Sequence, residues 1–283
     1  MGYFFILPAV VILFVVLILP VMGAVYESVG PSVRRGIDIP AGPGNFMRIA
    51  ADGVYLNAMT NTVVFTGASV LLHFALGLGA ALLLNLDLAG RGLFRVVALI
   101  PWTVAPVIVG VLWRWMYNAQ FGIINDIVLR LGISDEPRAW LGEASLAMPA
   151  VILANVWRGF PFAMLIALAG LQAVPREQLE AAAVDGAGAA RRFWHVTLPN
   201  IRYVLLIGVI LDAIWTFKQL DLVQVMTGGG PADATDVLTT LIYRTAFEYL
   251  DFPYASAMAV TMFVVLGIVT AVYVRLVMRE SDE

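Results

Sequence analysis

Two long stretches without a charged residue constrain this chain most. Residues 1–26 and Gly53–Leu86 contain no Asp, Glu, Lys or Arg. A helix needs about 20 largely apolar residues to cross about 30 Å of hydrocarbon, and both stretches reach that length. The 283-residue chain is 61% hydrophobic and 13% charged, against roughly 45–50% and about 25% in soluble globular proteins. The sequence therefore predicts a polytopic membrane protein.

The charged and metal-ligating residues exclude several classes of function. The formal net charge is −3, so the chain lacks the basic surface of a nucleic-acid-binding protein. It contains no Cys, which excludes disulfides, thiol catalysis and cysteine metal sites. Its two histidines, His73 and His195, are too few for a metal centre. We expect no metal site and no catalytic residue.

The spacing of charges predicts an all-α integral membrane protein with one domain over residues 1–283. The first span lacks a basic leading region and exceeds the length of a signal-peptide core, so it is expected to be retained. Arg114 interrupts the third span, Arg158 the fourth and Asp212 the short fifth. Six spans are predicted at approximately 3–25, 62–84, 96–117, 145–171, 203–217 and 255–277.

The distribution of basic residues orients these spans. Segments 85–95 and 172–202, with the end from Arg275 onward, hold eight Lys and Arg in under 60 residues. The three alternate segments hold seven across nearly 100 residues. Because Lys and Arg concentrate in cytoplasmic loops, we expect both termini in the cytoplasm.

The cytoplasmic segment 175–199 has the pattern of a short helix–turn–helix. Pro175 is suited to open a helix, with Glu177 and Glu180 near its positive end. Gly186 and Gly188 interrupt that helix, and a second helical stretch follows at about 189–195. Pro199 is expected to end this segment before the fifth span begins.

This segment resembles the signature loop of ABC-importer permeases: Glu-Ala-Ala, three residues, Gly, nine residues, then hydrophobic-x-Leu-Pro. Val196 stands where Ile is usual. The resemblance implies a type I importer permease fold with six transmembrane helices, in which 175–199 is a coupling helix seated on a cytoplasmic ATPase. The alternative is an Ala-rich interfacial helix, since Ala is the best helix former. The coupling residues implied are Glu180, Ala181, Ala182, Asp185, Gly186, Leu198 and Pro199.

Further short motifs resemble the sugar-importing permeases, on the side of the larger maltose-type subunit. They occur in the expected order along almost the whole chain: Arg91–Arg95, Ile100–Trp102, Trp113–Trp115, Trp157–Phe162, Leu168–Gln172 and Thr227–Pro231. Sugar recognition uses aromatic faces, with amides and hydroxyls for the sugar hydroxyl groups. For each Trp the alternative is interfacial anchoring or helix packing. The substrate path is expected at Trp102, Pro106, Asn155, Arg158, Gly159, Phe162, Trp215, Thr216 and Gln219.

Charges at membrane depth are costly and are functional candidates. The long side chain of Arg114 is expected to extend its charged end to the membrane–water interface. For Arg158, two roles stay open: binding of substrate, or an ion pair with Asp212. Asp212 could instead pair with Lys218, cap a local helix break or contact the substrate. His73 is expected to pack against or hydrogen-bond to a neighbouring helix. Gly228–Pro231 is expected to be a turn, since no Lys-Ser/Thr follows as in a phosphate loop.

The predicted function is that of a permease subunit in an ATP-driven importer of a di- or oligosaccharide such as trehalose or maltose. The chain itself is expected to be no enzyme and to bind no cofactor, with ATP and Mg on partner subunits. The expected partners are a second permease in a heterodimer, two ATP-binding cassette ATPases, an extracytoplasmic sugar-binding protein and the lipid bilayer. The expected location is the cytoplasmic membrane of a prokaryote.

Three alternatives stay open. Arg114 and Arg158 leave room for a phosphorylated polyol such as glycerol 3-phosphate. An ion-coupled secondary transporter would need inverted repeats and an intramembrane acid or His relay, and neither is evident. A membrane-embedded enzyme would need a clustered nucleophile or metal set.

Overall fold

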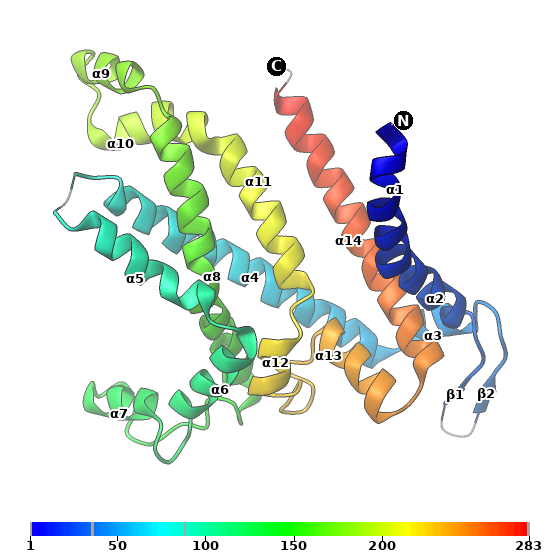
Figure 1. Cartoon of the computed structure of the whole chain (residues 1–283). Coiled ribbons are helices and arrows are strands. Elements are labelled where there is room, and N and C mark those ends of the chain that lie inside the picture. The colour runs from blue at the N-terminus through cyan, green and yellow to red at the C-terminus, as the bar shows by residue number, and fades with distance from the viewer. Residues whose placement is uncertain (1, 35–36, 88, 282–283) are drawn as a thin grey trace.

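The computed structural model describes residues 2–34, 37–87 and 89–281, which fold into helices and one small hairpin (Figure 1). The N-terminal helix comprises α1 (Gly2–Leu13), a π-helical turn η1 (Phe14–Ile18) and α2 (Leu19–Ser28). The hairpin pairs β1 (Ser32–Arg34) antiparallel with β2 (Ile37–Ile39), with Ser32 opposite Ile39. A short helix, α3 (Gly44–Ala51), leads into the core.

Five helical stretches of the described chain are long and apolar enough to cross a membrane, or six if one bent pair is counted as a span. They include α4 (Gly53–Leu84), α8 (Ala144–Ala173) and α14 (Phe252–Ser281). The predicted second span, 62–84, lies inside the longer α4. This helix starts at Gly53 because Asp52 caps it, accepting a hydrogen bond from the Val54 backbone N–H at 3.1 Å.

The third predicted span, 96–117, is a broken helix. Its two parts, α5 (Arg91–Thr103) and α6 (Pro106–Met116), meet at 94°. The break follows from Pro106, because the residue before a proline is driven out of the helical region. Ala105 accordingly has ψ of 139°. The sequence predicts one straight span here, because residues 96–113 carry no charge, and does not indicate so large a bend.

The fifth span is longer than the predicted 203–217. Here α10 (Ala189–Arg192), a π-helical turn η2 (Phe193–Thr197) and α11 (Leu198–Phe217) form one continuous helix of 29 residues. Pro199 was expected to separate the coupling segment from this span, but it lies inside the continuous helix, two residues after the π-helical turn η2. A proline has no N–H for the helical hydrogen bond, and a π-helical turn is a local departure from that bonding pattern. The remaining helices are α7 (Ile123–Arg130), α9 (Arg176–Val184), α12 (Asp221–Met226), α13 (Leu238–Tyr243) and the π-helical turn η3 (Arg244–Glu248).

Helix α8 is the centre of the bundle. It packs against α4, α5, α6, α11 and α12, and its core positions include the fully buried small residues Ala154, Ala163 and Ala167. Small side chains let helix backbones approach closely in a membrane. In the N-terminal helix, α2 instead packs against α14, at the periphery (Figure 1).

Different helices and loops lie at the two ends of the bundle. In Figure 1, α9, α10 and both labelled termini lie at one end, and α6, α7, α12, α13 and the hairpin lie at the other. The segment between α11 and α14 is more structured than a loop, because it contains α12, α13 and η3. We refer to these two ends as the coupling end and the distal end.

Candidate functional site

A cavity of about 120 Å³ opens between α4, α5, α8 and α11. Three of the helices that form it supply aromatic side chains, and all of its polar side chains come from α4, α8, α11 and the residues just after α11. Its walls consist of His73, Trp102, Asn155, Arg158, Gly159, Phe162, Asp212, Trp215, Thr216 and Gln219.

Three helices are joined through His73 at this cavity. Its Nδ1 lies 2.7 Å from Asp212 Oδ2, and its Nε2 lies 3.1 Å from the backbone oxygen of Asn155. All three residues are buried. A buried polar group is costly unless it is hydrogen-bonded, and here both ring nitrogens have a partner. The imidazole therefore holds α4, α8 and α11 in a fixed relation.

Gly159 leaves the space that the His73 ring occupies. A Cβ added at Gly159 would lie 2.2 Å from His73 Nε2 and 2.3 Å from Cε1. Such distances lie far inside van der Waals contact, so any side chain at 159 would displace the imidazole. The small residue at this point of α8 is required by the His73–Asp212 contact.

Three aromatic rings form a row in the cavity wall. Phe162 on α8 stacks with Trp102 on α5, with ring centroids 6.2 Å apart and 27° between planes. It also meets Trp215 on α11 edge to face at 4.9 Å. The row presents flat apolar surface to the cavity, and such surface suits the C–H faces of a sugar ring.

Two buried donors at this cavity have no hydrogen-bond partner among the described residues. They are Nδ2 of Asn155 and Nε of Arg158. Buried donors are nearly always paired in native proteins, and an unpaired one calls for an explanation. A ligand rich in hydroxyl or anionic oxygen would satisfy both.

Eight of the nine residues expected on the substrate path line this one cavity. Pro106 does not, because α6 turns away at the 94° bend that Pro106 itself introduces. Arg114 also lies away from it, where Nη1 contacts the Val225 backbone oxygen at 3.4 Å.

The sequence interpretation missed one residue of this wall and one contact. His73 was expected only to pack or hydrogen-bond, and that contact is present, but the ring also borders the cavity. For Asp212 the alternatives were Arg158, Lys218, a local helix break or the substrate; it does border the cavity, but its hydrogen-bonded partner is His73, which was not among them. The sequence did contain an indication of this contact: a single His and a single Asp lie in two spans that otherwise carry no charge, and ionisable residues inside a membrane usually pair with one another.

The coupling segment forms a helix–turn–helix on the coupling end, as the sequence predicts. Helix α9 is followed by a turn and by α10. Leu179 and Leu198 pack on the core cluster around Leu171, and Asn200 Nδ2 donates to Gln178 Oε1 at 2.9 Å. These contacts attach the segment to the bundle, while its outer surface stays exposed.

Most of the predicted coupling residues lie on this exposed surface. Glu180, Ala181, Asp185, Gly186 and Pro199 are exposed, and Ala182 and Leu198 are half-buried. Val184 and Trp194 add large apolar side chains that are 88% and 63% exposed. Large exposed apolar side chains at an end that also carries exposed charged residues are typical of a protein-interaction surface.

Gly186 makes the turn between the two helices. Its φ is +77°, in the left-handed region that glycine enters without the steric cost a Cβ imposes. The backbone N–H of Ala187 then donates to the Ala182 oxygen at 2.9 Å. The turn therefore depends on a glycine at position 186.

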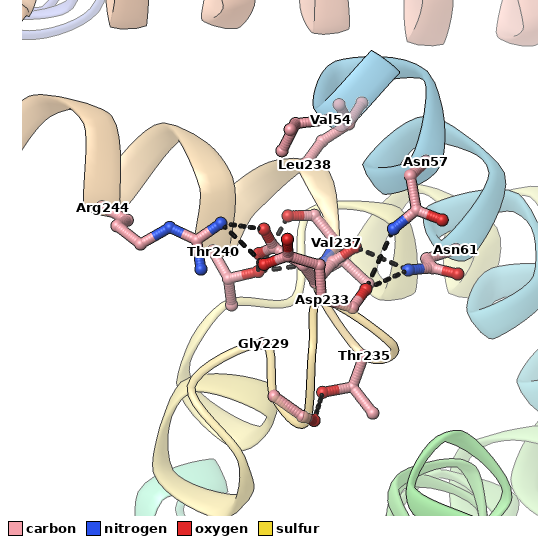
Figure 2. Close-up of polar contacts among 12 residues, drawn as sticks. Val54, Asn57, Asn61, Gly229, Asp233, Thr235, Val237, Leu238, Thr240 and Arg244 are labelled. Atoms are coloured by element: carbon pink, nitrogen blue, oxygen red, sulfur yellow. Dashed lines mark hydrogen bonds and ion pairs between the residues drawn. The ribbon is translucent and has the colours of Figure 1, made fainter. Parts of the chain in front are cut away.

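At the distal end, the segment 227–244 is held by a polar network (Figure 2). Asn57 and Asn61 on α4 both donate to the backbone oxygen of Asp233, at 2.9 and 3.0 Å. Gly228–Pro231 is a turn, as expected, closed by the Gly230 N–H to the Thr227 oxygen at 3.1 Å. Figure 2 also shows Thr235 bonded back to this turn, through Oγ1 to the Gly230 oxygen.

A buried carboxylate lies at the centre of this network. Asp236 is fully buried and forms an ion pair with Arg244, which also contacts Asp233 at 3.2 Å. Burial raises the pKa of Asp236, and the hydrogen bond from Thr240 and the charge of Arg244 oppose that rise. The cation thus compensates an otherwise costly buried charge.

Comparison with known proteins identifies the family. Residues 73–281, which include the cavity, the coupling segment and the distal segment 227–244, match the family described as the binding-protein-dependent transport system inner membrane component. The chain belongs to this family. It is a transport component rather than an enzyme.

Relatives over nearly the whole length agree with this assignment. The chain is 39% identical to the trehalose/maltose transport system permease protein MalF of Thermococcus litoralis, covering 97% of this chain and 92% of that protein. It is 35% identical to the sulfoquinovosyl glycerol transport system permease protein SmoG of Agrobacterium fabrum, covering 97% and 89%.

Solved structures confirm the fold. A bacterial ABC transporter involved in the import of the acidic polysaccharide alginate contains a chain that superposes with a TM-score of 0.85 at 20% identity, covering 98% of this chain and 94% of that one. The predicted type I importer permease fold is therefore confirmed. Family membership also speaks against the ion-coupled secondary transporter and the membrane-embedded enzyme.

Proposed function

We propose that the chain is one of two permease subunits of an ATP-driven importer that moves a di- or oligosaccharide, such as trehalose or maltose, across the cytoplasmic membrane. An extracytoplasmic binding protein delivers the sugar to the distal end. Two ATP-binding cassette ATPases, which hold ATP and Mg, act on the coupling end. The chain itself binds no cofactor.

The observation that carries the sugar assignment is the composition of the cavity. The aromatic row Trp102–Phe162–Trp215 lies near the unpaired donor of Asn155 and the polar side chains of Thr216 and Gln219. Aromatic faces with a few polar groups are what a sugar needs from a protein. The trehalose/maltose relative supports the same substrate class.

The cavity in this single chain is smaller than a sugar site. Its volume is about 120 Å³, and pockets for small molecules run from about 300 to 1,000 Å³. A second permease facing this wall would supply the remaining surface, which supports a path between two permease subunits.

The arrangement of the coupling end supports the role given to the ATPases. Glu180, Asp185 and Gly186 are exposed there, together with the apolar side chains of Val184 and Trp194. Both termini lie at this same end (Figure 1), in agreement with the expected cytoplasmic placement of both.

A second candidate is the import of a phosphorylated polyol such as glycerol 3-phosphate. The unpaired Nε of Arg158 at the cavity favours it, because guanidinium groups are suited to phosphate. The relative for sulfoquinovosyl glycerol transport supports an anionic substrate in the same way.

One experiment separates the two candidates. The binding protein that co-purifies with the chain is isolated, and its ligand is measured by calorimetry with trehalose, maltose and glycerol 3-phosphate. Binding of a neutral disaccharide supports the main proposal, and binding of glycerol 3-phosphate alone overturns it. Arg158→Ala in the permease provides the control, since it should reduce the uptake of a phosphorylated substrate far more than that of a neutral one.

A further inference from the structure

Helix α7 (Ile123–Arg130) lies at the distal end, to one side of the bundle (Figure 1). It follows α6 after a short turn and precedes α8. The cavity, the coupling end and the distal polar network involve none of its residues. Its side chains nevertheless follow a distinct pattern.

The helix has three different faces. Ile124 and Val128 are half-buried and Asn125 is buried, so this face lies on the protein. A second face carries the exposed ion pair of Asp126 and Arg130, at 2.9 Å. At the 3.6-residue period of a helix, positions 123, 127 and 131 form a third face between these two.

This third face is apolar and uncovered by the described chain. Ile123, Ile127 and Leu131 are all exposed, Leu131 by 67%. Phe121 before the helix and Ile133 after it are also exposed. A sixth exposed apolar residue of this segment, Leu129 (36%), lies on the other side of the helix. The five residues on and beside the third face form more apolar surface than isolated exposed residues, and such patches mark contact surfaces.

The segment that presents this face is firmly built. Asn125 donates to the backbone oxygens of Ala119 and Arg138, at 3.2 and 3.0 Å. Its Oδ1 accepts from the Arg138 N–H at 3.1 Å and from Trp140 Nε1 at 2.8 Å. One buried amide thus closes the loop 118–140, and the exposed apolar face is held in place by specific contacts.

The apolar face of α7 closely follows, along the chain, a helix of the bent span that also exposes apolar side chains. Helix α6, half of the bent span, exposes Ile108, Leu112 and Trp115. Trp is enriched where a span meets the membrane–water interface, and Trp115 lies in the last turn of α6. Six residues separate α6 from α7, so the two apolar surfaces are close along the chain.

We infer that α7 lies in the plane of the membrane surface at the distal end, with Ile123, Ile127 and Leu131 in the lipid. In this position the half-buried face of α7 packs on the protein, the apolar face contacts lipid and the charged face meets water. In-plane amphipathic helices bury their apolar face in the boundary between headgroups and acyl chains and keep charged residues outward. Asp126 and Arg130 then lie among headgroups and water. The occupant of this surface is the lipid itself, and the helix fixes the depth of the distal end in the bilayer.

The test exploits the absence of Cys from the chain. Single-cysteine variants Ile127→Cys and Asp126→Cys are labelled with a fluorophore in the full chain, together with the subunits that co-purify with it, in lipid nanodiscs. The two positions are adjacent in sequence and lie on different faces. Leu131→Cys, on the same face as Ile127, provides a second probe if Ile127→Cys does not assemble.

A nitroxide-labelled lipid and aqueous iodide serve as quenchers. We expect the lipid quencher to reduce the fluorescence at positions 127 and 131 by about twofold or more and iodide to have little effect, with the reverse at 126. Iodide quenching at 127 and 131 equal to that at 126 overturns the inference. Protection of 127 and 131 from both quenchers also overturns it, because a protein then covers the face. The result does not depend on which substrate is transported.

Discussion

The imidazole of His73 on α4 and the carboxylate of Asp212 on α11 are in contact, with 2.7 Å between Nδ1 and Oδ2. These residues lie 139 positions apart in the sequence. Through Nε2 the same ring reaches the Asn155 backbone oxygen on α8. The contact therefore sets the relative positions of the three helices that carry most polar groups of the cavity.

Asp212→Ala should destabilise the chain by about 1–3 kcal/mol, because it leaves His73 buried with one unpaired nitrogen. The double variant with His73→Ala should cost less than the sum of the two single variants, with a coupling of about 0.5–3 kcal/mol. Thermal denaturation in detergent, followed by size-exclusion chromatography, measures both. Lys218→Ala, at the exposed end of the same helix, is the control. Strict additivity of the two single effects would contradict the contact.

Gly159→Ala should also destabilise the chain, by about 1–3 kcal/mol, since the new Cβ overlaps the His73 ring. Gly79→Ala is a matched control, because a Cβ at that position of α4 meets nothing within 4 Å. Adding His73→Ala to Gly159→Ala removes the overlap and should recover part of the loss. The melting temperatures of these three variants check this, and an equal response of Gly79 and Gly159 would refute the argument.

Gly186→Ala should weaken coupling to the ATPases, because alanine at a φ of +77° costs about 1–2 kcal/mol and the turn between α9 and α10 then shifts. Gly188→Ala is the control: that residue has a φ of −66° and open space for a Cβ. The measurement is the amount of ATPase that co-purifies, with ATP hydrolysis stimulated by substrate. Both should fall for position 186 and stay near wild type for 188. The assignment fails if the two variants behave alike.

Arg244→Gln should loosen the distal segment 227–244, because Asp236 stays buried without its cation. Removing one partner of such a pair costs about 3–5 kcal/mol. Replacing both charges, with Asp236→Asn added, should restore much of the stability. Limited proteolysis of this segment provides the readout: faster cleavage in the single variant and slower cleavage in the double one. Equal rates in both would show that the pair contributes little.

The sequence contained enough to predict the spans, the coupling segment and most of the cavity wall. Charge-free stretches and the Glu-Ala-Ala pattern are properties of neighbouring residues along the chain, so they can be recognised without knowing how the helices pack. The 94° break between α5 and α6 was not foreseen, because Pro106 lies in an apolar run that also reads as a straight span. The partners of His73 and Asp212 were not foreseen either, since their contact depends on how α4 and α11 rotate against α8.

The most direct test of the proposed function is uptake of radiolabelled trehalose or maltose into proteoliposomes that contain the chain with its co-purifying subunits. We predict accumulation only when ATP is present on the side of the coupling end and the binding protein on the other side. Asn155→Ala and Trp215→Ala should lower that uptake while the ATPase subunits stay bound. Accumulation driven by an ion gradient, with the chain alone and no ATP, would contradict the account.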